Sequence, residues 1–261
     1  MGEFNLFLSE NLTVIVILLI VSLIVGYLFG SIPFAYLYCK AHNVDILKFG
    51  SGNPGSTNVG RALGKSHGRL IFVLDILKVV MPVILLRFIF LYFYLKIDFK
   101  LYFYFMTTHK NIDGELLSNF ISYDQFKFYR DFIAIYTGLG GIIGHNFPIF
   151  LNFKGGKGIS CTMGAILSFY FVYAILLFLF YKLITKITKY VSVGSLSAVS
   201  LFFISSLIFI FTNKTPYHYI SGVGYALLLI PGIFAMWFFA VLRHKENLIR
   251  LFNGTENKVK E

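Results

Sequence analysis

The polar stretch at residues 50–64 reads GSGNPGSTNVGRALG and interrupts an otherwise apolar chain. It is made mostly of glycine, serine, threonine and asparagine, and Arg61 is its only charge. Such a stretch cannot be a membrane span. Glycine permits backbone conformations that leave N–H groups open, and clusters of these groups bind anions. The stretch therefore predicts an anion-binding loop that leads into a helix, and the remaining segments are placed by asking which of them bring polar groups to it.

The composition is that of an integral membrane protein. Hydrophobic residues make up 57% of the chain and charged residues 13%, and the mean hydropathy is +0.75. A soluble domain carries about a quarter charged residues. The first apolar run, residues 12–37, is too long for the apolar core of a signal peptide and has no Lys or Arg before it, so we expect it to stay as a span.

The net charge of +11 raises the question of a nucleic-acid partner. In a membrane protein, basic residues in loops report orientation and attraction to an anionic leaflet, so no nucleic acid is expected. Cys39 and Cys161 form no metal-binding or redox spacing. We therefore expect neither a metal nor another cofactor.

The apolar runs predict an all-α, polytopic membrane protein that forms a single membrane domain over residues 1–261. A helix needs about 20 residues to cross a bilayer. We expect spans at residues 12–37, 70–95, 132–151, 159–184, 190–211 and 222–242. Residues 96–131, with many aromatics and mixed charges, are expected to be a peripheral insert.

Basic residues are concentrated in four connecting segments, at residues 38–69, 152–158, 182–190 and 243–261. If all four face the cytoplasm, the chain obeys the positive-inside rule. Two of them flank the run at 159–184, which must then enter the membrane and return. This predicts two short helices hinged near Ser168 and Phe169, and about seven transmembrane helices in all.

Three polar groups of residues would then meet at the cytoplasmic face. Arginine offers a planar fork of donors for phosphate, lysines beside a Gly-Gly turn offer point charges, and His244 and Asn247 share a helix face because they are three residues apart. The first group is Ser51, Gly52, Asn53, Thr57, Asn58 and Arg61, the second is His145, Lys154, Gly155, Gly156 and Lys157, and the third is Arg243, His244, Asn247 and Arg250.

Each motif alone has a simpler interpretation. The segment GSGNPG at residues 50–55 has the spacing of a dinucleotide fingerprint, but no strand precedes it; GRALGKS at 60–66 is one residue short of a phosphate-loop motif. A Gly-rich loop between spans is ordinarily a turn, and lysines after a span ordinarily signal topology. The meeting of three polar groups on one face is what favours a phosphate-binding site.

Four motifs strongly resemble one enzyme family. They are GSIPFAYL at 30–37, GSGNPGSTNVGRALG at 50–64, GHNFPIFLNFKGGKG at 144–158 and RHKENLIRL at 243–251. In this order they resemble the bacterial PlsY-type acyl-phosphate:glycerol-3-phosphate acyltransferases, over about residues 26–256 apart from the insert. The resemblance implies a seven-helix inner-membrane enzyme that makes lysophosphatidic acid, with an acyl-phosphate donor instead of acyl-CoA.

The candidate residues suit that reaction, because both substrates carry a phosphate. Ser51, Thr57, Asn58 and Arg61 would form one anion subsite, with Gly52, Asn53 and Arg250 nearby. Lys154, Lys157 and the amides of Gly155 and Gly156 would form the other. His244 and Asn247 would orient the glycerol end. His145 and His244 stay alternatives for positioning or base work, and the resemblance suggests that the substrate's own phosphate assists proton removal.

One alternative function stays open. A transporter of an organophosphate anion would bind near the middle of the membrane and often has two related halves; here the polar motifs lie at one face and no internal repeat is evident. Partners beyond the two substrates and the lipid bilayer would be other enzymes of phospholipid synthesis, such as a second acyltransferase that receives the product.

Overall fold

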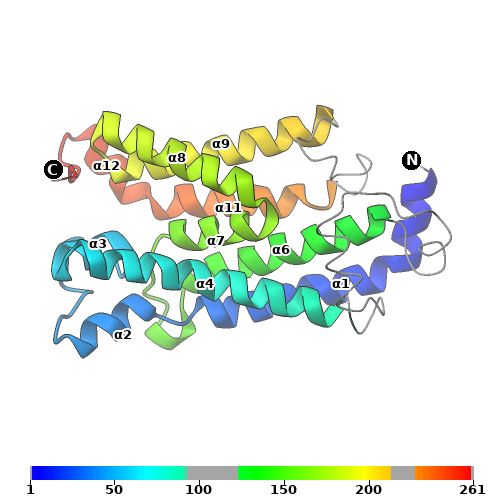
Figure 1. Cartoon of the computed structure of the whole chain (residues 1–261), viewed down its shortest axis with the longest axis horizontal. Coiled ribbons are helices and arrows are strands. Elements are labelled where there is room, and N and C mark those ends of the chain that lie inside the picture. Colours follow the sequence, from blue (N-terminus) through cyan, green and yellow to red (C-terminus); the bar gives the residue numbers. More distant parts are fainter. Residues whose placement is uncertain (1, 91, 93–122, 213–226, 260–261) are drawn as a thin grey trace.

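The computed structural model describes residues 2–90, 92, 123–212 and 227–259, and within these residues the chain is helical and contains no strand (Figure 1). The helices are α1 (Gly2–Gly30), α2 (Phe34–Ala41), α3 (Ser56–Leu63), α4 (Lys65–Ile89), α6 (Tyr123–Asn146), α7 (Ile159–Phe169), α8 (Phe171–Thr188), α9 (Val191–Thr212), α11 (Ile230–Arg243) and α12 (Lys245–Phe252), with a short 3-10 helix at Ile149–Leu151. The prediction of an all-α membrane protein is confirmed.

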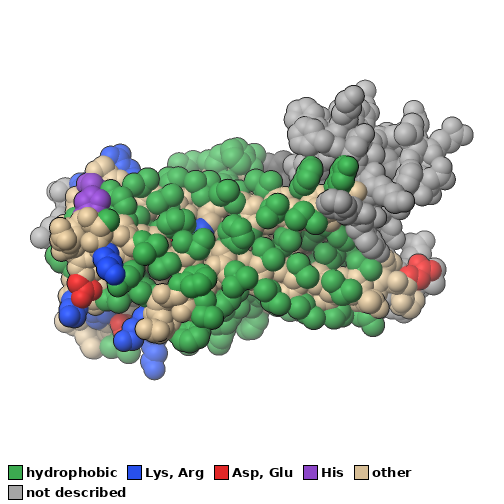
Figure 2. Space-filling model, turned by 90° about the horizontal axis from the view of Figure 1, so that it is seen from below, with side chains coloured by type: hydrophobic (Ala, Val, Ile, Leu, Met, Phe, Trp, Pro, Cys, Tyr) green, Lys and Arg blue, Asp and Glu red, His purple; other side chains and the backbone are tan. Residues whose placement is uncertain are grey.

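The longer helices lie side by side along one axis, and the short helices α2, α3 and α12 gather at one end, here called the polar end (Figure 1). Four stretches are long and apolar enough to cross a membrane: Ser9–Ala41, Phe128–Leu151, Phe171–Thr188 and Val191–Thr212. Figure 2 shows a broad hydrophobic surface along the bundle, with Lys and Arg gathered mainly at the polar end. The chain is therefore a multi-pass membrane protein.

The run at residues 159–184 is broken into two helices, as predicted from orientation. The helix α7 ends at Phe169, and α8 begins at Phe171. Tyr170 between them has an extended backbone, with φ −139° and ψ 93°. The described residues then hold seven helices along the bundle axis, namely α1, α4, α6, α7, α8, α9 and α11. That all seven cross the membrane remains a prediction.

Several predicted boundaries are wrong. The apolar run at 12–37 is two helices, because α1 ends at Gly30 and Pro33 disfavours helical backbone in the residue before it. The helix α6 begins at Tyr123, inside the predicted insert at 96–131, so the last turns of that segment belong to the bundle. Residues 96–122 of the insert lie outside the described residues, as do 213–226, which include the start of the span predicted at 222–242.

Glycine allows α1 and α6 to pack backbone against backbone. A Cβ on Gly26 would lie 2.1 Å from the carbonyl oxygen of Thr137, and one on Gly144 would lie 2.2 Å from that of Tyr27. Small residues at such contacts let helices approach closely in membranes. This contact places the end of α6, with His145, beside the chain that leaves α1.

Candidate active site

The Gly50–Gly64 stretch is half loop and half helix. Gly50 and Gly52 have positive φ values of 58° and 67°, where glycine is favoured. Asn58, in the first turn of α3, is fully buried and holds the loop: its Nδ2 donates to the Phe49 carbonyl (2.8 Å), and its Oδ1 accepts from the Ser51 N–H (3.3 Å). Asn58 thus organises the loop, and the exposed Arg61 lies one turn later.

A pocket opens at the polar end and extends between α4, α7, α8 and α9. Its polar lining brings together ten predicted residues: Ser51, Asn53, Thr57, Asn58, Arg61, His145, Lys157, His244, Asn247 and Arg250. Its apolar lining includes Phe72, Met163, Ile166, Leu177, Phe178 and Val199. One end of the pocket is therefore cationic and polar, while the other is lined by hydrocarbon.

Not every predicted residue reaches this pocket. Gly52, Lys154 and Gly155 line a neighbouring open cavity together with Arg243, and Gly155 and Gly156 line a third, smaller one. The expected pairing of Lys154 with Lys157 in one subsite is therefore not formed. The sequence could not separate the two lysines, because they flank the same short Gly-Gly turn.

The backbone of Gly155 and Gly156 forms hydrogen bonds within the protein, whereas the sequence predicted that its amides bind phosphate. The Gly156 N–H donates to the His145 carbonyl (3.0 Å). Arg243 donates from Nε to the Gly156 carbonyl (3.0 Å) and from Nη2 to that of Gly155 (2.8 Å). The expected use of the Gly156 amide for phosphate is thus wrong, because a protein carbonyl already accepts its hydrogen. Arg243, which α11 contributes, holds this turn in place.

The C-terminal segment ties the pocket's polar residues together. Lys157 Nζ donates to Asn247 Oδ1, and Asn247 Nδ2 donates to Glu256 Oε1 (2.6 Å). Arg250 Nε donates to Glu256 Oε2 (2.8 Å), and Ser192 Oγ donates to Oε1 (3.0 Å). Residues Ser192 and Glu256 were missed, since nothing in the sequence pairs α9 with the tail. Arg250, expected to bind substrate, holds Glu256.

Burial and these contacts set the charges of the network. Burial shifts the pKa of Lys157 down to about 8, and the nearby Arg250 cation adds to the effect. For Glu256, burial alone would raise the pKa, but hydrogen bonds from Asn247, Arg250 and Ser192 outweigh it and lower the pKa. The tail carboxylate is therefore ionised, and Lys157 is a cation that titrates close to physiological pH.

His244 lies between α11 and α12, is buried, and bonds through Nδ1 to the Ala240 carbonyl at 2.7 Å. Burial is the main cause that lowers its pKa, to about 4. The ring is therefore neutral near pH 7. Asn247, three residues on, faces the same pocket, so the predicted pairing of these two side chains on one face is confirmed.

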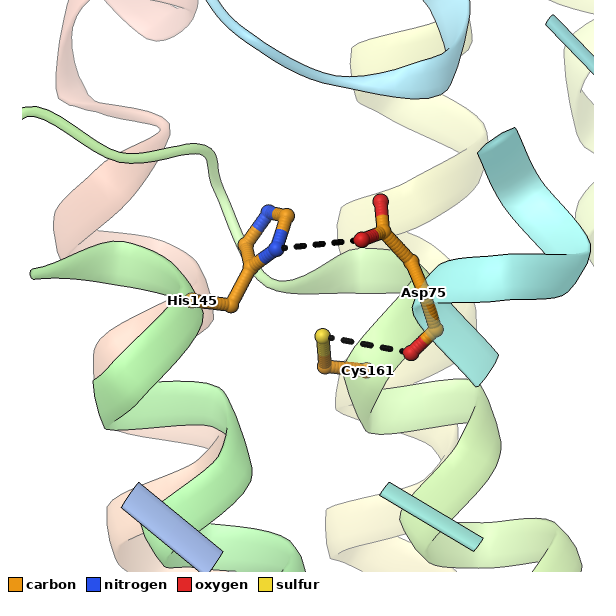
Figure 3. Close-up of side chains that lie close together, drawn as sticks. All are labelled: Asp75, His145 and Cys161. Carbon is orange, nitrogen blue, oxygen red and sulfur yellow. Dashed lines mark hydrogen bonds and ion pairs between the residues drawn. The ribbon is translucent and has the colours of Figure 1, made fainter. Parts of the chain in front are cut away.

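A buried charged cluster lies beneath the polar end (Figure 3). Figure 3 shows Asp75 and His145 of this cluster. Lys78 Nζ is 2.8 Å from Asp75 Oδ1 and 2.9 Å from His145 Nδ1, and it donates to the Ile32 carbonyl at 3.1 Å. Asp75 and Lys78 lie three residues apart on α4, and both side chains are buried inside the bundle. Their contact with His145 was not foreseen.

The same cluster contains three potential metal ligands, since ligand atoms of Asp75, His145 and Cys161 lie within 4.8 Å of one another. Cys161 donates its S–H to the Asp75 backbone carbonyl (3.5 Å), so it is engaged as a thiol. The Lys78 ammonium lies at the point where a cation would contact both Asp75 and His145. These residues therefore do not suit a metal ion.

Comparison with known proteins gives one consistent answer. A family model described as glycerol-3-phosphate acyltransferase matches residues 20–254. A glycerol-3-phosphate acyltransferase of Thermotoga petrophila is 35% identical over 238 residues, covering 90% of this chain and 94% of that protein. One of Mycoplasma pneumoniae is 31% identical over 257 residues, covering 94% and 96%.

Solved structures agree in fold. A crystal structure of PlsY, an integral membrane glycerol 3-phosphate acyltransferase, in its glycerol 3-phosphate form superposes with a TM-score of 0.65. It is 28% identical, and the match covers 93% of this chain and 96% of that chain. The lysophosphatidic acid form of that protein gives a TM-score of 0.63, with 95% of its chain covered.

Proposed function

Because the chain belongs to the glycerol-3-phosphate acyltransferase family, we propose that it moves a fatty acyl group from acyl-phosphate to the 1-hydroxyl of sn-glycerol 3-phosphate. The product is lysophosphatidic acid, and the reaction takes place at the inner membrane with the pocket open to the cytoplasm. The protein acts without a metal or organic cofactor.

The observation that carries this proposal is the two-part lining of the pocket. Arg61 and Lys157 supply positive charge at one end, while Met163 and Leu177 line the other end. A fatty acyl-phosphate and a lysophosphatidate are both amphiphiles with a phosphate head, so they match a pocket with a cationic end and a hydrocarbon end. A soluble organophosphate alone would leave the apolar half without a purpose.

The proposed reaction does not require a strong base. The 1-hydroxyl oxygen attacks the acyl carbonyl carbon, the bond from that carbon to the phosphate oxygen breaks, and inorganic phosphate leaves. Positive charge near the leaving phosphate lowers the barrier, because it neutralises charge that develops as the bond breaks. Arg61 and Lys157, which line the pocket, would supply this charge. The hydroxyl proton passes to a phosphate oxygen of the bound substrate.

The orientation follows from charge. The segments at residues 38–69, 152–158, 182–190 and 243–259 lie at or near the polar end, and they carry most of the Lys and Arg of the chain (Figure 1). The positive-inside rule then supports a cytoplasmic pocket. Glycerol 3-phosphate and acyl-phosphate would reach it from that side, and the acyl chain would extend among α4, α7, α8 and α9.

The transporter alternative is less well supported. A transport site is expected near the middle of the membrane, between repeated halves. The cations of the described pocket, Arg61, Lys157 and Arg250, belong instead to loops and helix ends at the polar end.

The deciding experiment is acyl transfer to labelled glycerol 3-phosphate by the purified protein in detergent, with acyl-phosphate and acyl-CoA supplied in parallel and no metal added. We expect lysophosphatidate from acyl-phosphate alone. Product from acyl-CoA only would overturn the donor assignment. No product from either donor, from a folded protein that still binds glycerol 3-phosphate, would favour the transporter.

A further inference from the structure

The two histidines of the pocket, His145 and His244, have different hydrogen-bond partners at the same ring atom. His244 Nδ1 faces the Ala240 carbonyl oxygen at 2.7 Å. A carbonyl can only accept, so Nδ1 of His244 carries the hydrogen. In a neutral imidazole the other nitrogen, Nε2, is then a bare acceptor.

For His145 the partner at Nδ1 is the ammonium of Lys78, at 2.9 Å. An ammonium has three hydrogens and no lone pair, so it can only donate. Lys78 Nζ also forms an ion pair with Asp75 Oδ1 at 2.8 Å. Nδ1 of His145 must therefore accept, and the ring hydrogen lies on Nε2.

The three hydrogens of Lys78 are all accounted for by Asp75 Oδ1, His145 Nδ1 and the Ile32 carbonyl. The alternative contact of His145 with Asp75 is 3.6 Å, too long for a good hydrogen bond from Nδ1. Lys78 is nearly fully buried, so water does not compete for these contacts. The position of the His145 proton is thus set from within the bundle.

The second nitrogen of His145 points the other way. In Figure 3 the ring turns Nδ1 toward Asp75 and Nε2 away from it. The ring lines the pocket and packs against Gly156. A Cβ added to Gly156 would lie 2.1 Å from His145 Nε2. No hydrogen bond to Nε2 is formed within the described residues, so this N–H is available to a ligand.

We propose that Lys78 is a positioning residue that locks His145 as an Nε2–H hydrogen-bond donor, which leaves His244 as the one pocket histidine with a bare ring acceptor. His145 then donates to an oxygen of the bound phosphate or acyl group, and it takes no part as a base. The identity of these ligand oxygens rests on the proposed function, whereas the assignment of the two tautomers does not.

The tautomers are tested directly by NMR on the full-length protein in micelles with 15N-labelled histidine. The signals of His145 and His244 are assigned by their loss in His145→Asn and His244→Asn. We expect the protonated nitrogen to be Nε2 in His145 and Nδ1 in His244. A proton on Nδ1 of His145, or an imidazolium at neutral pH, would overturn the proposal whether or not the enzyme is active.

Kinetics with Lys78 variants test the consequence. Lys78→Met keeps the apolar stem but removes the donor, and we expect kcat to fall about 10- to 100-fold with little change in KM for glycerol 3-phosphate, as for other residues that orient a functional histidine. The 15N pattern of His145 should change while that of His244 stays. Lys78→Arg, which still donates, should retain the Nε2–H pattern and recover part of kcat.

The matched control is Arg87→Met, which removes another buried cation from α4 at a distance from the pocket. It should lower thermal stability but leave both histidine patterns unchanged. An unaltered His145 pattern and kcat in a folded Lys78→Met protein would contradict the positioning role.

Discussion

Lys157 donates a hydrogen bond through Nζ to Asn247 Oδ1, and this contact joins the loop before α7 to the first turn of α12. The two residues are far apart in the chain, and both line the pocket. Their contact turns two separate sequence motifs into one site. Lys157 is therefore held in place by Asn247, the side chain that the sequence predicts to orient the glycerol end.

This contact predicts strong coupling between the two residues. Lys157→Ala and Asn247→Ala should each reduce kcat/KM, and the double variant should lose less than the product of the two losses. Contacting residues typically show coupling of about 0.5–3 kcal/mol. The control is Lys65→Ala, exposed at the start of α4, whose effect should simply add to that of Asn247→Ala. Independent effects of Lys157 and Asn247 would mean that the contact does not operate in the active protein.

The pH dependence follows from Lys157. Burial lowers its pKa to about 8, so the cation is present below that pH and is lost above it. We expect kcat/KM for glycerol 3-phosphate to fall as pH rises through about 8, measured in initial-rate assays across pH 6–10. Lys157→Arg stays charged and should move the fall to higher pH. The exposed Lys186→Arg should not move it, and an unchanged profile in Lys157→Arg would assign the titration to another group.

Arg61 is expected to contact substrate phosphate, because it is exposed and lines the pocket one turn after Asn58. Arg61→Ala should lower kcat/KM by about 100-fold, the usual cost of losing a donor that stabilises developing negative charge. Membrane insertion and thermal stability should be unchanged. Arg69→Ala, an exposed arginine outside the pocket, serves as the control. Full activity of a correctly inserted Arg61→Ala protein would remove Arg61 from the site.

Gly156 has no room for a side chain, since a Cβ would lie 2.1 Å from His145 Nε2. Gly156→Ala should therefore displace the His145 ring, lower activity and reduce stability by about 1–3 kcal/mol. In Gly60→Ala the nearest atom would be 3.7 Å away, so that variant should fold and gain helix propensity. Activity and thermal unfolding are measured for both variants. Equal activity and equal stability of the two would show that the Gly156 turn adjusts to the added methyl group at little cost.

The acyl chain is expected to lie against α9 near Ala198, which lines the pocket. Ala198→Phe should shorten the apolar part and shift the preference toward shorter acyl-phosphates, assayed with a chain-length series. Ile204→Phe, on the exposed side of the same helix, should leave the preference unchanged. If the long-chain rate survives in Ala198→Phe, the chain takes another route.

The sequence predicted the helical membrane fold and most of the pocket for clear physical reasons. Apolar length identifies spans, and the distribution of Lys and Arg required a break in the run at 159–184, which the structure has at Tyr170. The residue types of Arg61, Lys157 and His244 suit phosphate and hydroxyl groups, and the structure gathers them.

The features that the sequence could not predict depend on packing between helices that are far apart in the chain. Lys154 and Lys157 are equivalent by composition, but only Lys157 lines the pocket. The contact of Lys78 with His145 required the register of α4 against α6, and that of Glu256 with Ser192 required the path of the tail. The spacing of Asp75 and Lys78 in an apolar helix was the one available signal for the buried cluster.

The path of the tail also decides how the protein can be handled. The Val259 N–H donates to the Lys189 carbonyl (2.8 Å), so the C-terminal segment runs beside the pocket. The N-terminus lies at the opposite end of the bundle (Figure 1). A purification tag or fluorescent reporter appended at the C-terminus would crowd the pocket entrance and pull on Glu256. An N-terminal fusion would place the label at the end of the bundle that is far from the pocket.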